Sequence, residues 1–202
     1  MPSKTMEVYE KIRDDVVKLR LRTDELLNEK DLAEQYSVSK TPVREALAML
    51  VQDGYLKKIP RVGYLIREVT DEEYYKLIYL RYTLEKGVVQ WIIERCGDDE
   101  IASLREYCTA ADISYRDLAG INYDFHMTMA RLTKNEYLIS SVQNVFDRII
   151  RVPSVTLFQQ FQEEPHGYHL QLIDAMLARD LSTALELIRH ECQRDDDKDF
   201  CL

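Results

Sequence analysis

The 202-residue chain carries 27 Lys and Arg against 36 Asp and Glu, which gives a formal net charge of −9 and a pI near 5.0. Its longest apolar stretch, at residues 88–93, is interrupted by Gln90 and is too short to cross a membrane, and the first residues lack the apolar segment of a secretory leader. Its four widely spaced cysteines predict free thiols in a reducing cytoplasm and exclude a Cys-x-x-Cys site.

Charge is unevenly distributed along the chain. Residues 1–69 hold 13 Lys and Arg against 12 Asp and Glu, so the remaining residues carry a net charge of −10. Affinity for DNA depends on where cations cluster and not on the total charge, so an acidic pI does not exclude a DNA-binding protein. We expect a roughly neutral domain at 1–69 and an acidic domain at 70–202.

Two segments near the N-terminus have the spacing of amphipathic helices. The first is predicted at about 5–19, where the apolar residues are Val8, Ile12, Val16 and Leu19. A second, short helix is predicted at about 29–36, and residues 37–38 form a turn after it. Helix, turn and helix in this order predict a helix-turn-helix unit.

Residues 39–53 are predicted to form a DNA-recognition helix. Ser39 or Thr41 can cap its first turn, and Gly54 supplies a left-handed stop. One face is apolar, while the opposite face carries Ser39, Lys40, Thr41 and Arg44. Hydroxyls and cations at a helix N-terminus suit phosphates and base edges in a major groove. The alternative, an ordinary amphipathic helix with a polar start, does not account for the helix before it and the hairpin after it.

The hairpin is predicted from two short β-prone runs at 55–59 and 62–66, which flank Pro60 and Arg61. A hairpin directly after a recognition helix is typical of a wing. Arg61 at its tip could reach a minor groove or a phosphate, whereas Lys57 and Lys58 fit a solvated strand edge.

Residues beyond 70 show helical spacing almost throughout, and few glycines or prolines interrupt it. The predicted helices lie at about 71–95, 98–110, 114–132, 135–151, 155–163, 166–179 and 181–195. The predicted fold is therefore mainly α, with an N-terminal winged helix-turn-helix followed by an all-α helical bundle. Within the bundle, Arg81 can pair with Glu85 one turn later.

These residues carry a resemblance to a known family. The segment Ser-Val-Ser-Lys-Thr-Pro-Val-Arg-Glu-Ala-Leu at 37–47, with 29–34 before it and Arg-Val-Gly at 61–63 after it, resembles the GntR-type winged-helix transcription regulators. The C-terminal part resembles the all-helical effector (FCD) domain of their FadR-like branch, through Arg-Tyr-Thr-Leu-Glu at 81–85, Phe-His at 125–126 and His169.

The first part of the resemblance implies a set of DNA contacts. Family members usually have arginine where Lys40 stands, and lysine lacks the planar fork that suits guanine, so Lys40 favours phosphate over base readout. The implied DNA-contacting residues are Lys30, Ser39, Lys40, Thr41, Arg44, Arg61 and Gly63.

The second part implies a divalent metal in the bundle, which many relatives hold with an aspartate and three histidines and use to bind a carboxylate effector. Asn122 occupies the aspartate position here, and His126 and His169 match. The last ligand falls on Glu191 or on His190, which lie about 100° apart around a helix. Such a set would suit Zn²⁺, Ni²⁺ or Mn²⁺. The alternative is that these are ordinary core or surface histidines.

The expected function is a ligand-responsive transcription regulator. The resemblance implies a homodimer on operator DNA, usually a repressor, whose binding responds to a small carboxylate effector clamped by Arg81. The competing hypothesis is a metal-dependent enzyme in which His126, His169 and a nearby carboxylate hold a catalytic ion. The sequence offers that enzyme no clearly placed general base.

Overall fold

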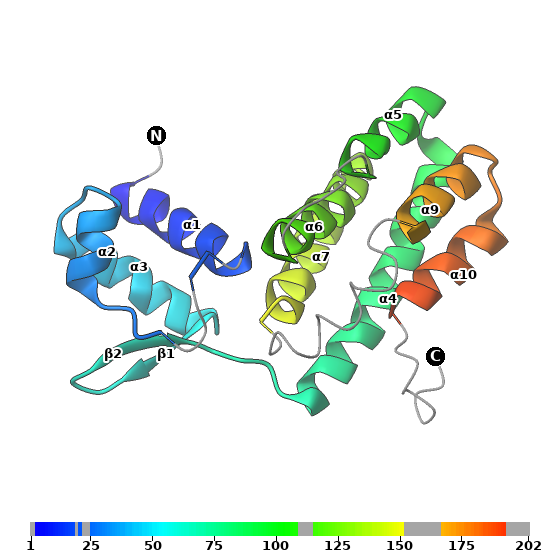
Figure 1. Cartoon of the computed structure of the whole chain (residues 1–202). Coiled ribbons are helices and arrows are strands. Elements are labelled where there is room, and N and C mark those ends of the chain that lie inside the picture. The colour runs from blue at the N-terminus through cyan, green and yellow to red at the C-terminus, as the bar shows by residue number, and fades with distance from the viewer. Residues whose placement is uncertain (1–2, 19, 22–24, 109–114, 152–166, 193–202) are drawn as a thin grey trace. The chain divides into compact units, whose positions relative to one another are not determined.

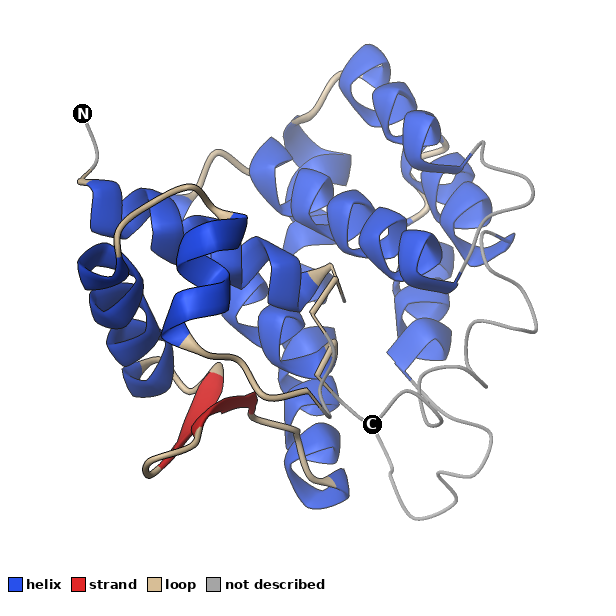
Figure 2. Cartoon of the chain, turned by 60° about the vertical axis from the view of Figure 1, so that its left-hand side comes forward, coloured by secondary structure: helices blue, strands red, loops and turns tan. Residues whose placement is uncertain are grey.

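The structure is a computed structural model that describes residues 3–18, 20–21, 25–108, 115–151 and 167–192. Figure 1 shows the elements in chain order, and Figure 2 shows that, within the described residues, one two-stranded sheet stands among helices. The contacts divide the chain into two units, Met1–Val69 and Thr70–Leu202.

The first unit is a winged helix-turn-helix. Its elements are α1 (Lys4–Val17), α2 (Glu29–Gln35), α3 (Lys40–Gln52), β1 (Leu56–Ile59) and β2 (Gly63–Ile66). Ser3 caps α1 by accepting from the Met6 N–H at 3.2 Å, and Asn28 caps α2 by accepting from the N–H groups of Lys30 and Asp31. These caps fix where each helix begins.

The core of this unit lies mainly between α1 and α3, which make its most extensive helix contact. The apolar stripe predicted on α3 is buried, with Val43, Ala46, Leu47 and Leu50 all 0% exposed. Burying one leucine of this kind stabilises the fold by roughly 2 kcal/mol relative to leaving it in water. Gly54, with φ +77°, ends α3 as predicted. Its N–H donates to the Val51 carbonyl, and the N–H of Tyr55 donates to the Leu50 carbonyl.

The wing is an antiparallel hairpin in which Leu56 pairs with Ile66 and Ile59 with Gly63. Leu27, just before α2, forms an isolated antiparallel β-bridge with the hairpin: its N–H donates to the Tyr64 carbonyl at 2.8 Å, and the Tyr64 N–H donates to its carbonyl at 2.9 Å. The wing is therefore tied to the start of α2 as well as to the end of α3.

The second unit is all-helical within the described residues. Its elements are α4 (Asp71–Arg95), α5 (Asp98–Ala102), the 3-10 helix η1 (Ser103–Cys108), α6 (Tyr115–Leu132), α7 (Glu136–Ile149), α9 (Gly167–Leu177) and α10 (Leu181–Cys192). The 25-residue α4 is the central helix and packs against both α7 and α10. Its buried residues recur three or four positions apart and so lie on one face, including Tyr74, Ile78, Val89 and Ile92.

The predicted fold class is confirmed, and the boundaries differ in a few places. The helix expected at 98–110 is split into α5 and the 3-10 helix η1, and the Ser103 hydroxyl donates to the Glu100 carbonyl at 2.7 Å where the two elements meet. The helix expected at 155–163 lies outside the described residues. Cys96, Cys108 and Cys192 are free thiols as predicted, and Cys201 lies outside the described residues.

Among the helices that the structure describes, none combines the length and the apolarity that a bilayer crossing requires.

Candidate nucleic-acid interface and ligand cluster

The N-terminal end of α3 presents its polar side chains to solvent. Ser39 is the N-cap residue, with β-region backbone, and its side chain makes no capping hydrogen bond. Lys40, Thr41 and Arg44 are all exposed. The predicted contact residues of the first helical turn are thus accessible, and the positive end of the helix dipole lies beside them.

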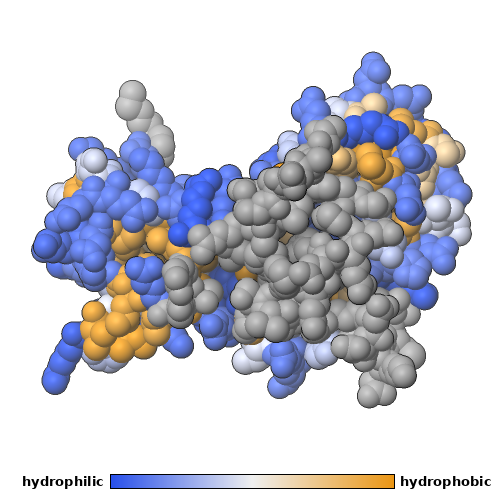
Figure 3. Space-filling model, viewed as in Figure 1, coloured by the Kyte–Doolittle hydropathy of each residue, from blue (hydrophilic) through white to orange (hydrophobic). Residues whose placement is uncertain are grey.

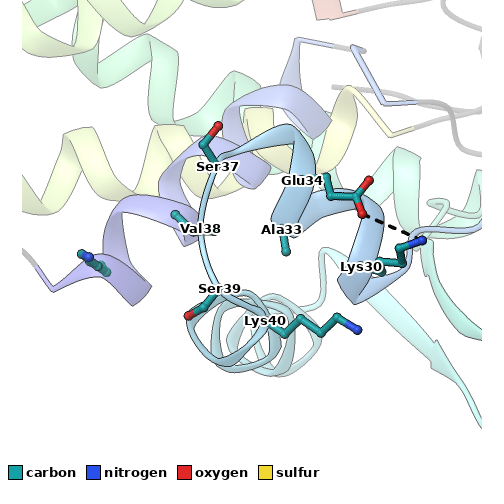
Figure 4. A pocket seen from close by; sticks show the side chains of 8 residues that line it. Lys30, Ala33, Glu34, Ser37, Val38, Ser39 and Lys40 are labelled. Carbon is teal, nitrogen blue, oxygen red and sulfur yellow. Dashed lines mark ion pairs between the residues drawn. The ribbon is translucent and has the colours of Figure 1, made fainter.

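A cleft of about 500 Å³ lies between α2, the turn and the start of α3, and Figure 4 shows it from close by. Lys30 and Lys40 extend along one side of it, and Lys4 also lines it. Lys30 pairs with Glu34 at 3.9 Å, but both side chains are about two-thirds exposed, so water screens this pair strongly. Three lysines beside a helix N-terminus form a favourable place for a DNA phosphate.

Arg44 is held by a carboxylate that the sequence reasoning did not identify. Its Nε and Nη2 donate to Glu29 on α2 at 2.8–3.0 Å in a two-pronged ion pair. The hydrogen bond from Arg44 lowers the pKa of Glu29, and the same contact raises the pKa of Arg44. Arg44 stays 64% exposed at the side chain, so Glu29 orients the guanidinium without covering it. A pair across a helix-turn-helix leaves no periodic signal in the sequence.

The wing tip carries an exposed arginine on a strained backbone. Arg61 has φ +66°, a left-handed conformation that is uncommon for a residue other than glycine. Val62 beside it is 55% exposed, and Leu26 in the adjoining segment is 46% exposed. Hydrophobic residues gather over the hairpin in Figure 3. Arg61 can therefore reach outward as predicted, from a tip whose neighbours are apolar.

Gly63 has a packing role that the sequence reasoning did not identify. A Cβ at this position would lie 2.6 Å from the Leu27 carbonyl oxygen, and the backbone φ of +156° also disfavours a side chain. The glycine thus allows β2 to approach the backbone of Leu27 closely. Its proposed contact with DNA remains a separate prediction.

We expect Gly63→Ala to destabilise the first unit by about 1–3 kcal/mol, because the added methyl group must push two hydrogen-bonded backbones apart. Urea unfolding followed by circular dichroism measures the loss. Gly120→Ala on α6 is the control: no described atom lies within 4 Å of its Cβ position, so alanine there should not destabilise. Equal stability of Gly63→Ala and the wild type would contradict the packing role.

In the second unit, His126, His169 and Glu191 meet in the interior. They come from α6, α9 and α10, and one ligand atom from each lies within 4.8 Å of the others. Glu191 Oε2 is 3.3 Å from His126 Nε2, and its Oε1 is 3.3 Å from His169 Nε2. We call these three residues the ligand cluster. His126 and His169 are 1% and 4% exposed.

The two remaining predicted ligands are His190 and Asn122. His190 is exposed on α10, 3.9 Å from Glu186 and stacked on Tyr168, so the structure does not bring it to the ligand cluster. Glu191, one residue later, is the member that faces inward. Asn122 is partly buried, one turn before His126 on α6.

Arg81 and Glu85, one turn apart on α4, complete the buried network. Arg81 Nε donates to Glu85 Oε2 at 2.7 Å, and its Nη2 lies 3.0 Å from His126 Nε2 and 3.1 Å from Glu191 Oε2. Glu85 Oε1 is 2.5 Å from the other ring nitrogen, His126 Nδ1. Arg81 thus pairs with Glu85, as one of the two interpretations from the sequence expects, and its Nη2 also contacts the ligand cluster, while its binding of an effector carboxylate stays a prediction.

The charges of this network follow from mutual contacts that outweigh burial. Burial alone would favour the neutral acids, but His169, His126 and Arg81 lower the pKa of Glu191 to about 2, and Arg81 and His126 lower the pKa of Glu85. Burial opposes the charge on Arg81, yet Glu85 raises its pKa further above the ordinary value. The two carboxylates and the guanidinium are therefore charged at neutral pH.

Burial and the neighbouring charges act on the pKa of His126 in opposite directions. Burial lowers its pKa, while Glu85 and Glu191 raise it to a net increase. However, a guanidinium can only donate, so the Arg81 contact requires an acceptor lone pair on Nε2. In the arrangement with this hydrogen bond, Nε2 is therefore unprotonated and the ring proton is on Nδ1, beside Glu85 Oε1.

The donor set of the ligand cluster fits a divalent transition metal. Two imidazole nitrogens and a carboxylate are ligands that Zn²⁺, Ni²⁺ and Mn²⁺ accept, and a carboxylate behind one of the histidines is a frequent supporting contact. Phe125 stacks on His169 at 4.0 Å and Phe146 on His126 at 4.9 Å between ring centroids, which holds both imidazoles in place. When bound, such an ion would supply a positive centre for an anionic ligand.

Known proteins resemble both units. The family described as bacterial regulatory proteins, gntR family, matches residues 4–66, and the FCD domain matches residues 76–193. The Nta operon transcriptional regulator of Aminobacter aminovorans is 34% identical over 137 residues, which cover 66% of this chain and 65% of that protein. The HTH-type transcriptional repressor GlaR of Escherichia coli is 25% identical over 199 residues, 92% of this chain and 90% of that protein. Among solved structures, E. coli McbR/YncC has a TM-score of 0.81 at 24% identity, over 96% of this chain and 95% of that one.

Proposed function

Because the chain belongs to the GntR family of bacterial regulators and carries an FCD domain, we propose that it binds operator DNA through its first unit and adjusts that binding to a small carboxylate metabolite held in its second unit. The observation that carries the DNA-binding part is the exposed cationic surface around the start of α3, where Lys40 and Arg44 of α3 and Lys30 of α2 are all accessible.

In this proposal α3 enters the major groove with its N-terminal turn toward the bases. Arg44 offers the planar fork for a guanine edge, while Lys30 and Lys40 bind phosphates and Ser39 and Thr41 add hydroxyl contacts. The wing places Arg61 beside the neighbouring backbone or minor groove. The proposal includes a cytoplasmic location and repression as the direction of control; the name of GlaR as a repressor supports the latter.

The effector part of the proposal rests on the ligand cluster. Phe125 and Phe146 stack on its histidines, the histidines and Glu191 could hold a divalent ion, and the Arg81 guanidinium beside Glu191 is a group that could bind a carboxylate. The matched proteins are described as transcriptional regulators, which gives no support to the metal-dependent enzyme considered from the sequence.

The proposal can be tested with labelled duplexes that carry the DNA upstream of the protein's own gene. Fluorescence anisotropy should show binding that is tighter than to a scrambled duplex and that weakens steeply as salt rises, because several lysines release counterions from phosphates. A folded protein that binds neither duplex at the lowest salt would overturn the proposal.

A homodimer would bring two α3 helices to one operator, and α4 offers a surface for it. Tyr79 and Leu80 are 55% and 45% exposed there. Gly87, two turns after Leu80, has no described atom within 4 Å of its Cβ position. Apolar side chains beside a small residue allow a second helix to approach closely.

We expect Leu80→Glu to raise the dimer dissociation constant about tenfold or more, because it places two like charges in a shared apolar contact. Sedimentation velocity over a range of concentrations measures the change. Tyr137→Glu on α7, at a side chain that is 78% exposed, is the matched control and should leave the dimer intact. A dimer that tolerates Leu80→Glu as well as Tyr137→Glu would place the interface elsewhere.

A further inference from the structure

A cation, the Arg81 guanidinium, already contacts the ligand cluster. The Arg81 guanidinium is 6% exposed as a residue, and its Nη2 lies 3.0 Å from His126 Nε2 and 3.1 Å from Glu191 Oε2. These are two of the atoms that a divalent ion would need. The arginine thus neutralises the inward carboxylate and occupies the imidazole lone pair.

One lone pair cannot serve both cations. A metal bound to an imidazole lies about 2 Å from the nitrogen, along the lone pair that accepts the Arg81 hydrogen bond. The two positive charges would also repel each other strongly in a buried site. We infer that Arg81 is the resident cation of the ligand cluster and that a divalent ion binds only by displacing its Nη2 from His126 and Glu191.

The structure also shows how the arginine could leave without losing all its partners. Its Nε is anchored to Glu85 one turn later on α4, at 2.7 Å, and its guanidinium lies over the Phe146 ring at 4.7 Å. The guanidinium is planar, so Nη2 and Nε–H would move together, and Glu85 would remain beside the displaced arginine as its charge partner. The released guanidinium N–H groups would then be available to a ligand carboxylate. This inference rests on the effector part of the proposed function.

Calorimetric titration with NiCl₂ alone tests the competition. Arg81→Met removes both the charge and the donors, so it should bind Ni²⁺ about tenfold tighter or more than the wild type, since the ion no longer breaks charge-assisted hydrogen bonds. Arg105→Met is the matched control, because Arg105 is an exposed arginine that pairs with Asp174 outside the cluster. Its Ni²⁺ affinity should stay within about twofold of the wild type.

Arg81→Lys covers the case in which Arg81→Met does not fold, as judged by circular dichroism. Lysine keeps a buried charge but cannot contact Glu85 and the ligand cluster through separate N–H groups as Nε and Nη2 do, so a smaller gain in Ni²⁺ affinity is expected. Crystals of the wild type soaked in NiCl₂ give a second readout. An ion on His126 Nε2 should coincide with an Arg81 Nη2 that has moved beyond hydrogen-bond distance of that nitrogen.

Three results would overturn the inference: Ni²⁺ affinity that falls or stays unchanged in the folded Arg81 variants, no Ni²⁺ binding by any variant, or an ion bound while the Arg81 contact with His126 persists. None of these titrations contains DNA. A failure here therefore leaves the duplex-binding test standing, and a failure of duplex binding does not affect the titrations.

Discussion

Replacing Arg44 with alanine is expected to weaken operator binding about a hundredfold or more, because the proposed dimer would lose two bidentate base contacts at once. The structure gives the side chain an orienting partner in Glu29 and leaves it accessible, which are the conditions for a preformed contact. Fluorescence anisotropy with the upstream duplex at a fixed salt concentration measures the loss. Affinity for a scrambled duplex should fall much less, so the ratio of the two affinities should shrink.

Arg20→Ala is the matched control for this variant. Arg20 is also an exposed arginine of the first unit, and it also pairs with carboxylates, Asp14 and Asp15, at the end of α1. It lies outside the predicted contact set, so its replacement should change operator affinity by no more than about twofold. Operator binding that survives Arg44→Ala in a folded protein would show that α3 does not read the bases through this residue.

The second large effect is on stability. Glu85→Ala is expected to destabilise the second unit by about 3–5 kcal/mol, because it leaves the buried Arg81 with one carboxylate fewer and removes the charge beside His126 Nδ1. Glu85 is 2% exposed, so water cannot replace the lost contacts. Chemical unfolding monitored by circular dichroism measures the change, and the transition of the first unit serves as an internal reference.

The control on the same helix is Glu72→Ala. Glu72 pairs with Lys76 one turn later at 2.6 Å, but both side chains are more than 70% exposed. Solvent screens such a pair, so the unfolding transition should not move measurably. If Glu85→Ala unfolded like Glu72→Ala, the buried network would have to be regarded as easily rearranged.

Periodicity in the sequence was sufficient for the elements that pack by an apolar stripe. The bounds of α4 agree with the prediction to the residue, and α1, α2, α3 and the wing agree within about two. The split between α5 and η1 was not predictable in this way, because apolar spacing does not distinguish one or two turns of 3-10 helix from α-helix.

The ligand cluster shows a different limit of sequence reasoning. Counting along the chain left His190 and Glu191 as alternatives, because neighbouring residues on a helix point about 100° apart and small errors in alignment exchange them. Only the packing of α10 against α4 and α9 shows that Glu191 is the residue turned inward. The contact of Arg81 with His126 joins residues 45 positions apart, and no local pattern encodes it.

The two hydrogen bonds between Leu27 and Tyr64 have a consequence for how such a regulator would discriminate between DNA sites. They link the segment just before α2 with the hairpin, so the distance between α3 and Arg61 is set before any duplex arrives. The grooves of a bound duplex would then have to match this fixed distance between α3 and Arg61. Sites whose base steps adopt the required groove width easily would bind more tightly than stiffer sites with identical contacted bases.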